Sequence, residues 1–292
     1  MSEKVFNLLE RTNLNWSVKK EPLFTNDGKN TESFGLFRND NEQWLGTVGN
    51  RYQVYNNSKL ATIIVNAAEG LVDTDLITGG SLGEGKKVFL QIPLEDKHIH
   101  TDTIKRNITA LNSHDGSTSI GFGSSNTVVV CRNTFYQAHK ELKKFRHTDS
   151  ADQQIKKASE QLKQAILKDN KLMEDYSRMV DVTIDKSIFG SLVKKLFDVN
   201  LDVRQKDVST RKKNTLVEFQ RTVESELASH GETLWGLFNG VTYFTNHIET
   251  KNKNASETKE HLMVGSGYRK NLIAFDEIMK FVNTKTSTKI FI

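Results

Sequence analysis

The chain has little cysteine and little proline. A single cysteine, Cys131, among 292 residues cannot form an internal disulfide. Because Cys131 lies in an apolar run, we expect it to pack as a small buried hydrophobic side chain rather than to act as a nucleophile. Two prolines leave no Pro-rich adaptor segment and no Pro-rich linker. These absences exclude a disulfide-stabilised scaffold and favour a globular chain.

Long hydrophobic runs are also missing. No stretch of about 18 apolar residues is present to cross a bilayer, and residues 1–6 lack the apolar segment of a secretory signal. We therefore expect no membrane contact and a cytoplasmic location. The hydrophobic content of 36% is nevertheless enough for a sizeable core.

Positive charge exceeds negative charge only slightly. The chain has 41 Lys and Arg against 36 Asp and Glu, a formal net charge of +5. Affinity for a polyanion depends on how many cations face one groove, so clustering matters more than the sum. Cations accumulate in the first half, and we take them, with polar and aromatic neighbours, as candidate nucleic-acid-binding residues. These are Arg51, Tyr52, Lys86, Lys87, Lys105, Arg106, Arg132, Asn133, Lys143, Lys144, Arg146 and His147.

Hydrophobic periodicity predicts an α+β fold. In the first half it indicates helices over residues 3–12 and 60–67 and strands near 16–18, 33–37, 44–48, 101–111 and 127–131, with a Gly-rich hairpin over 74–92. In the second half it indicates helices over 151–179, 188–197, 216–227, 234–244 and 272–282. We therefore expect a β-rich amino-terminal domain, residues 1–148, with a β-hairpin, crossing helices and a basic groove. Residues 149–292 form a helical region packing on it or on a neighbouring subunit.

One segment combines an apolar strand with a helix-capping residue. Residues 128–132 lead directly into Asn133, whose side chain is a good helix N-cap, so a helix is expected over 133–142. Helix N-terminal amides and the surrounding cations Arg132, Lys143 and Arg146 would then form a phosphate contact.

Two further motifs have competing interpretations. Residues 80–86 match part of a phosphate-binding loop, but Lys87 replaces the required Ser or Thr and a strand follows, so a hairpin tip carrying Lys86 and Lys87 is favoured. Tyr52, beside Arg51, suits base stacking in single-strand binding. It and Tyr55 equally suit a role in covering the core, and both interpretations stay open.

Histidines and carboxylates in the first half could hold a divalent metal. Their spacing matches no specific template, and surface histidines beside turns are the alternative. The residues are His98, His100, Asp102, His114 and Asp115. Residues 235–244 have a wide apolar face, which indicates core packing or a subunit contact rather than a cofactor site.

Five motifs of the chain occur together in a known group of proteins. They are residues 45–49 with Tyr52 and Val54, 112–113 with 115–117, 130–134, 146–148 and 235–239. On these motifs the chain resembles the phage/plasmid-like proteins grouped as domain of unknown function 932. The likeness spans roughly residues 40–280 and implies DNA metabolism of mobile elements in bacterial hosts, without established catalytic residues. A more distant likeness of element order is to phage single-strand annealing proteins of the RecT and Redβ type, in which a basic groove lies in an oligomeric ring.

We therefore expect a non-catalytic protein of a phage or plasmid system that binds and anneals single-stranded DNA as a homo-oligomer, with no cofactor. Two alternatives stay open. One is a metal-dependent nuclease or processing enzyme that uses the histidine and carboxylate set. The other is a phage-encoded module that binds a host protein through the aromatic segment near Trp235. A separate nuclease partner is also compatible with the expected function.

Overall fold

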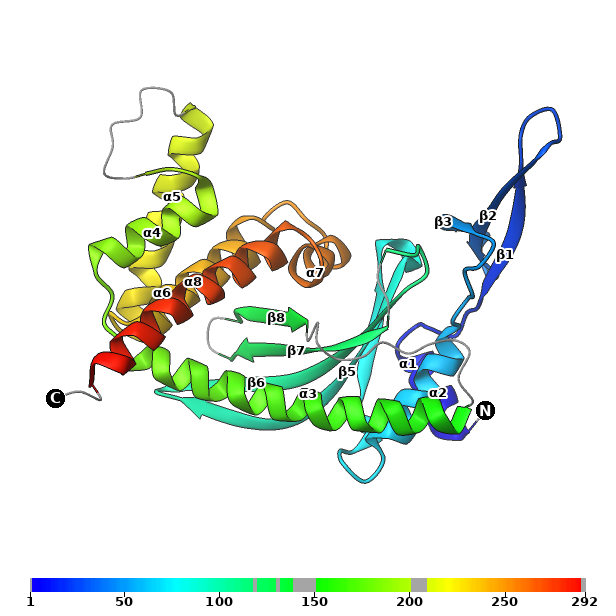
Figure 1. Cartoon of the computed structure of the whole chain (residues 1–292), viewed down its shortest axis with the longest axis horizontal. Helices are drawn as coiled ribbons and strands as arrows, with labels where there is room; N and C mark the ends of the chain where they lie inside the picture. Colours follow the sequence, from blue (N-terminus) through cyan, green and yellow to red (C-terminus); the bar gives the residue numbers. More distant parts are fainter. Residues whose placement is uncertain (1, 118–119, 130–131, 139–150, 201–208, 290–292) are drawn as a thin grey trace. The chain divides into compact units, whose positions relative to one another are not determined.

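The computed structural model describes residues 2–117, 120–129, 132–138, 151–200 and 209–289 (Figure 1). The chain divides into two compact units, and each unit is assembled from three chain segments. Unit 1 comprises Met1–Glu95, Asn107–Ser125 and Ala138–Asp169, and unit 2 comprises Asp96–Arg106, Asn126–Gln137 and Asn170–Ile292. None of the described helices is both long enough and apolar enough to cross a membrane.

Unit 1 contains a small antiparallel sheet with the strand order β1-β2-β3. Its strands are β1 Val18–Phe24, β2 Asn30–Arg38 and β3 Trp44–Gly49. The turn between β1 and β2 contains Asp27 and Gly28, and Gly28 has a φ of +79°, a conformation that glycine adopts without strain. Pro22 lies in β1, an edge strand, where its missing N–H costs no sheet hydrogen bond.

A second sheet has the strand order β4-β5-β6-β7-β8, and its three middle strands contribute residues to both units. The strands are β4 Thr78–Leu82, β5 Lys87–Ile99, β6 Asp102–Ser113, β7 Gly121–Val128 and β8 Thr134–Ala138. The β4–β5 hairpin confirms the Gly-rich turn expected from the sequence. Its tip uses the left-handed conformation at Glu84, with φ +59°, and at Gly85, with φ +101°.

The core of unit 1 is closed by helices α1, α2 and the first part of α3. These helices are α1 Glu3–Arg11, α2 Asn57–Ala68 and α3 Ala151–Val180. Helix α1 begins because the Ser2 side chain accepts a hydrogen bond from the Val5 amide, and it buries Val5, Leu8 and Leu9 on one stripe. Ala158, Leu162 and Ala165 of α3 belong to the same core.

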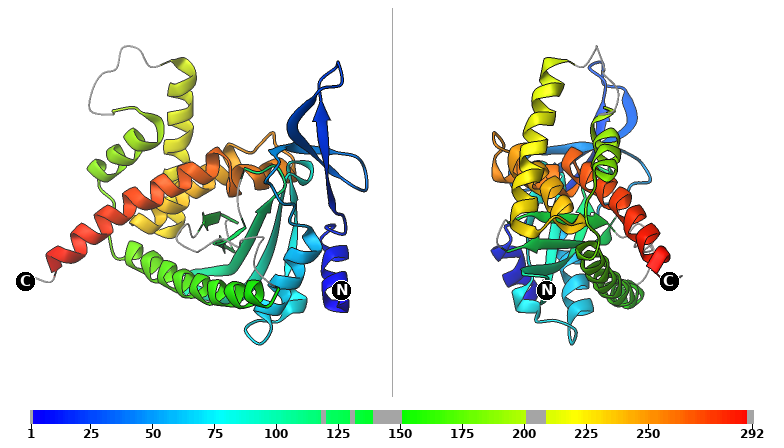
Figure 2. Two further views of the ribbon diagram at one scale, coloured as in Figure 1. Left: turned by 45° about the vertical axis from the view of Figure 1, so that its right-hand side comes forward. Right: turned by 90° about the vertical axis from the view of Figure 1, so that its left-hand side faces the viewer.

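Unit 2 is largely helical, and Figure 2 shows its helices from two directions. In addition to the end of α3 it contains α4 Lys186–Phe197, α5 Thr210–His230, α6 Leu234–Tyr243, a π-helical turn Phe244–Ile248, α7 Ala255–Met263 and α8 Ser266–Lys289. The aromatic segment expected to pack internally does so, since Trp235, Phe238 and Phe244 are each at most 3% exposed. Neighbouring aromatic rings, such as Phe135 and Phe238 at 5.1 Å, contact one another in this core.

The α+β class, with strands concentrated in the first half and helices in the second, is confirmed. The helix expected over residues 133–142 is wrong where the structure describes it. After β7 the chain turns at Arg132, with φ +56°, and continues as β8. The Val128 amide donates to the Asn133 carbonyl at 3.0 Å, so strand pairing overrides the local capping preference of Asn133.

Replacing Gly240 with Ala tests how closely α5 and α6 pack. A Cβ at this position would lie 2.9 Å from Val223 Cα, so the helices must separate, at a cost of about 1–3 kcal/mol in the free energy of unfolding. Gly190→Ala in α4 is the matched control, because its methyl group meets no atom within 4 Å and helix propensity adds up to about 1 kcal/mol. Urea unfolding followed by circular dichroism compares the two. Equal stabilities would contradict this packing.

Candidate functional site

The segments singled out in the sequence collect into two buried polar clusters, one in each unit. The His114 cluster of unit 1 consists of Tyr52, Asn57, Lys87, His114 and Asp115. The Asp102 cluster of unit 2 consists of Asp102, Asn133, Glu226, His230, Trp235 and Asn239. The third candidate site is the exposed surface near the tip of the β4–β5 hairpin, where Trp44, Glu84 and Lys86 lie.

His114 lies just after β6 and is completely buried. Asn57 donates from Nδ2 to the carbonyls of Leu14 and Trp16, at 3.1 and 3.2 Å, so its Oδ1 is left as the acceptor that faces His114 Nε2 at 2.9 Å. The proton of the neutral imidazole therefore belongs on Nε2. Burial lowers the pKa of His114 to about 4, which keeps the ring uncharged at neutral pH.

The same cluster decides the two interpretations of Tyr52. Its hydroxyl donates to the Ser113 carbonyl at 3.1 Å, and its ring packs against the core of unit 1, so Tyr52 covers the core. Burial, together with the nearby Asp115 carboxylate, raises the pKa of Tyr52. Lys87 Nζ lies 3.2 Å from Asp115 Oδ2, and the two side chains are 12% and 16% exposed. The charge of Lys87 is thus compensated by Asp115.

An aromatic side chain that the sequence reasoning did not select lies beside Lys86. Trp44, the first residue of β3, is 48% exposed, and Lys86 Nζ lies 5.4 Å from its ring centroid. The next two residues, Leu45 and Gly46, are both buried, and the pairing of β3 with β2 shifts register at this point. The two-residue period of a regular strand is therefore interrupted at Trp44, and the sequence pattern did not reveal its exposure. Glu84 belongs to the same tip and accepts a hydrogen bond from Gln43 at 3.1 Å.

The Asp102 cluster is centred on one carboxylate oxygen. Asp102, at the start of β6, is 3% exposed, and its Oδ2 accepts a hydrogen bond from Trp235 Nε1 at 2.7 Å and lies 2.8 Å from His230 Nδ1. On the other side of the ring, His230 Nε2 lies 3.3 Å from Glu226 Oε2. Burial works to raise the pKa of Asp102, but the bonds from His230 and Trp235 outweigh it and hold this pKa below its usual value. Asp102 is therefore a buried ionised acceptor.

Amide side chains hold Asn133 and Thr134 at the start of β8. Asn133 Nδ2 donates to Glu226 Oε2 and to the Asn239 carbonyl, both at 3.2 Å. In the π-helical turn, Asn246 accepts from the Thr134 amide at 3.0 Å and donates to the Thr134 carbonyl at 3.1 Å. The buried side chain of Asn133 thus bonds to α5 through Glu226 and to α6 through Asn239.

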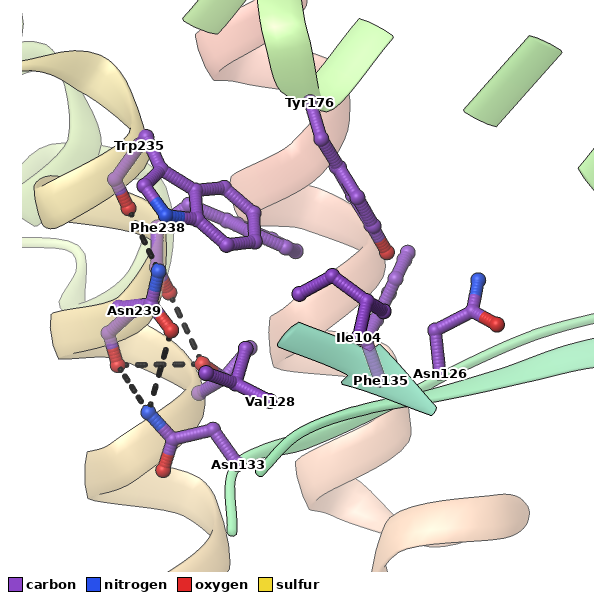
Figure 3. Close-up of a pocket in the computed structure, with 10 residues that line it drawn as sticks. Ile104, Asn126, Val128, Asn133, Phe135, Tyr176, Trp235, Phe238 and Asn239 are labelled. Carbon is purple, nitrogen blue, oxygen red and sulfur yellow. Dashed lines mark hydrogen bonds between the residues drawn. The ribbon is translucent and has the colours of Figure 1, made fainter. Parts of the chain in front are cut away.

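A small pocket lies beside these amides in unit 2 (Figure 3). Its walls include Asn126, Asn133, Tyr176, Trp235 and Phe238. The ring centroids of Tyr176 and Trp235 are 5.0 Å apart, and the space has room for about one water molecule. A pocket of this size is part of a packed core and cannot admit a nucleotide.

The proposed metal ligands do not assemble into one site. Within the described ranges, no group of three or more His, Cys, Asp or Glu is arranged to hold a metal ion. His98 Nδ1 lies 3.2 Å from the Thr103 hydroxyl, and the carboxylate of Asp102 is engaged by His230 and Trp235. These residues therefore give the nuclease hypothesis no support.

The predicted nucleic-acid-binding residues fall in both units. Arg51, Tyr52, Lys86 and Lys87 belong to unit 1, and Lys105, Arg106, Arg132 and Asn133 belong to unit 2. Arg51, Lys105 and Arg132 are exposed, whereas Arg106 is 4% exposed and donates to Asn170 Oδ1 at 2.5 Å. Because Asn133 begins no helix, the helix amides expected beside Arg132 are absent from this corner. Lys143, Lys144, Arg146 and His147, like Cys131, lie outside the described residues.

The neutral His114 predicts a pH-dependent stability. The folded-state pKa of about 4 lies below the ordinary value of 6.5, so the contribution is complete above pH 6.5 and is lost as the pH falls toward 4. We expect wild type to lose about 3 kcal/mol of unfolding free energy over this window from His114. Urea unfolding at several pH values compares wild type with His114→Gln. The same pH dependence in both proteins would refute the assignment.

Replacing Asp102 with Ala leaves the donors of Trp235 and His230 without their acceptor. We expect a loss of on the order of 3 kcal/mol in stability, concentrated in unit 2, because both groups stay buried. Hydrogen exchange read by mass spectrometry follows α5 and α6 directly. Asp181→Ala, at an exposed position after α3, is the control and should exchange like wild type. If α5 and α6 of Asp102→Ala exchange hydrogen as slowly as in wild type, the Asp102 carboxylate does not stabilise these helices.

Comparison with known proteins gives one result that covers most of the chain. A family model described as a domain of unknown function, DUF932, matches residues 44–264. Neither a curated protein nor a solved structure matches the chain. The matched range includes Trp44, the His114 cluster and the whole Asp102 cluster. The chain belongs to the DUF932 family.

Proposed function

We propose that this protein binds single-stranded nucleic acid, with single-stranded DNA as its substrate, and that it pairs complementary strands without covalent chemistry. The observation that carries the proposal is the exposed indole of Trp44 with the Lys86 ammonium over one face of its ring, which leaves the other face for a base. An aromatic face next to a cation is the arrangement on which unpaired bases stack. Every base has such a face, so binding of this kind is tolerant of sequence.

Stacking contributes more to this proposal than charge does. Lys87, at the same hairpin, is paired with Asp115, and the tip also carries the exposed carboxylate of Glu84. Arg51, in the turn after β3, is exposed and adds a cation to unit 1. A surface with mixed charges and an open indole favours a single strand over a duplex, whose bases are already stacked.

The two alternatives expected from the sequence gain less support. A nuclease needs an open site, but Asp102 and His114 are at most 3% exposed. A host-protein contact through the aromatic segment needs an exposed face, but Trp235 is 2% exposed within unit 2.

The analogy with annealing proteins covers part of the chain. Helix α2, the β4–β5 hairpin and β6 follow the expected order, but a strand, β8, stands where a second helix was expected. The proposal therefore depends on the Trp44 surface, which is the exposed Trp44 indole with Lys86. We also propose that the protein assembles into a homo-oligomer.

A pairing assay tests the annealing step: two complementary oligonucleotides should form a duplex faster with the protein than without it. An unchanged rate would restrict the function to binding.

Trp44→Ala should weaken binding of a labelled oligothymidylate by about 5- to 150-fold, the loss of about 1–3 kcal/mol of stacking on one base. Trp44→Phe should retain most of the affinity, because it keeps an aromatic face. Fluorescence anisotropy measures both variants.

Phe6→Ala is the matched control for the Trp44 variants. Phe6 is 44% exposed on α1, a similar exposure to Trp44, and no cation is seen beside its ring among the described residues. Its removal should leave affinity unchanged. Equal affinities for wild type, Trp44→Ala and Phe6→Ala would reject the Trp44 surface as the binding site.

A further inference from the structure

We propose a second nucleic-acid contact, within unit 2, in which four exposed cations of α4 and α5 bind the phosphates of a single strand. This inference rests on the proposed function and extends it to a surface that stacking does not explain. The four residues, called the α4–α5 patch, are Lys194, Lys195, Arg211 and Lys213.

The last turn of α4 and the first turn of α5, which carry these cations, lie next to each other in unit 2. Lys194 and Lys195 occupy the last turn of α4, which ends at its C-cap, Asp198. Lys212 Nζ, in the first turn of α5, donates to the Asp198 carbonyl at 3.1 Å. This bond places the first turn of α5, which carries Arg211 and Lys213, next to the last turn of α4.

Aromatic packing holds the two helices in this arrangement. The rings of Phe197 in α4 and Phe219 in α5 contact each other edge to face, with centroids 5.0 Å apart. Phe189 lies about two turns before Phe197 in α4, and its ring stacks on that of Phe219 with centroids 6.1 Å apart. These aromatic contacts join α4 to α5, and the cations of the patch are exposed at the helix ends.

The position of the cations on α5 is unfavourable for folding. The first turn of a helix carries partial positive charge and is stabilised by acidic side chains. In α5 that turn contains Arg211, Lys212 and Lys213 and no acidic residue. Residues that lower stability where they stand are often retained for function, so these cations indicate a functional role. Lys212 already serves the contact with Asp198, so Arg211 and Lys213 are the cations of this turn for which binding of an anion supplies that role.

The patch also lacks the ion pairs that compensate lysines elsewhere in unit 2. Lys251 lies 2.7 Å from Glu218, and Lys280 lies 2.6 Å from Glu277. Across the described residues, none of the four patch cations comes within 4 Å of a carboxylate oxygen. Lys195 lies close enough to Glu277 of α8 for its charge to act on that carboxylate, so Lys194, Arg211 and Lys213 are the patch cations with no carboxylate partner among the described residues.

A nucleic acid fits this surface better than a membrane does. A helix that lies on a membrane presents a continuous apolar face. On α5 the exposed positions are predominantly polar or charged, and Val217 is the large apolar side chain among them. A chain of phosphates supplies repeated charges at a spacing that several lysines and arginines can follow, with no need for apolar contact.

The test removes three charges at once from the patch. The patch variant is Lys194→Gln, Arg211→Gln and Lys213→Gln. The control variant is Lys251→Gln, Lys253→Gln and Lys259→Gln, which removes the same charge from another part of unit 2. Fluorescence anisotropy with a labelled oligothymidylate, measured over a range of NaCl concentrations, gives the dependence of affinity on salt. We expect the patch variant to lower the slope of log affinity against log salt by about two, since each phosphate contact contributes about 0.7.

Stability provides a second readout of the same variants. The patch variant should melt close to the temperature of wild type, because two of its substitutions remove cations from the positive end of α5 and one removes Lys194 from the negative end of α4. A markedly lower melting temperature would mean that the three side chains serve the fold, and would overturn the inference. An unchanged salt slope in a folded patch variant would also overturn it.

Two further arms separate this inference from the proposed function. If wild type binds the oligonucleotide and Trp44→Ala weakens it, but the patch variant matches the control variant, the patch is wrong and the proposed function stands. If wild type binds no oligonucleotide, the proposed function fails and elution from immobilised heparin still tests the patch. Elution of the patch variant at a lower salt concentration than the control variant supports the inference. Elution of both variants at the same salt concentration overturns it. Binding of wild type to phosphatidylserine vesicles in preference to the oligonucleotide would overturn the assignment to nucleic acid.

Discussion

A buried carboxylate organises unit 2. Asp102 ties the start of β6 to the end of α5 through His230 and to the start of α6 through Trp235. Through Glu226 and Asn239 the same helices hold Asn133, next to the exposed Arg132. An ionised group at this depth is tolerated because each neighbouring donor is aimed at it. Asp102, which the sequence offered as a metal ligand, is thus buried among the bonds that join β6, α5 and α6.

Unit 1 uses the same principle with a neutral group. His114 is buried without charge and fixed by Asn57, and the adjacent Lys87 is compensated by Asp115. These contacts immobilise the hairpin next to Lys86, the cation beside the exposed Trp44. A rigid support of this kind reduces the conformational entropy lost when a base stacks on the indole. The polar core and the proposed binding surface are therefore parts of one arrangement.

Periodicity in the sequence predicted the β-rich first half, the helical second half and the β4–β5 hairpin, because each depends on local pattern. The helix at Asn133 was wrong because a capping preference of one residue is weaker than pairing with β7. Helix α7 was missed although Asn254 and Glu257 form a capping box that can be read from the sequence. The contacts of Asp102 join residues 128 and 133 positions apart, and no local pattern reveals such pairs.

The central claim is that unpaired bases stack on Trp44, and intrinsic tryptophan fluorescence tests it most directly. The other two tryptophans, Trp16 and Trp235, are 7% and 2% exposed, so quenching by a bound base should come from Trp44. We predict that oligothymidylate quenches the emission of wild type and leaves that of Trp44→Phe unchanged. Equal quenching in both proteins, or no quenching of wild type under conditions in which the oligonucleotide is bound, would contradict the account.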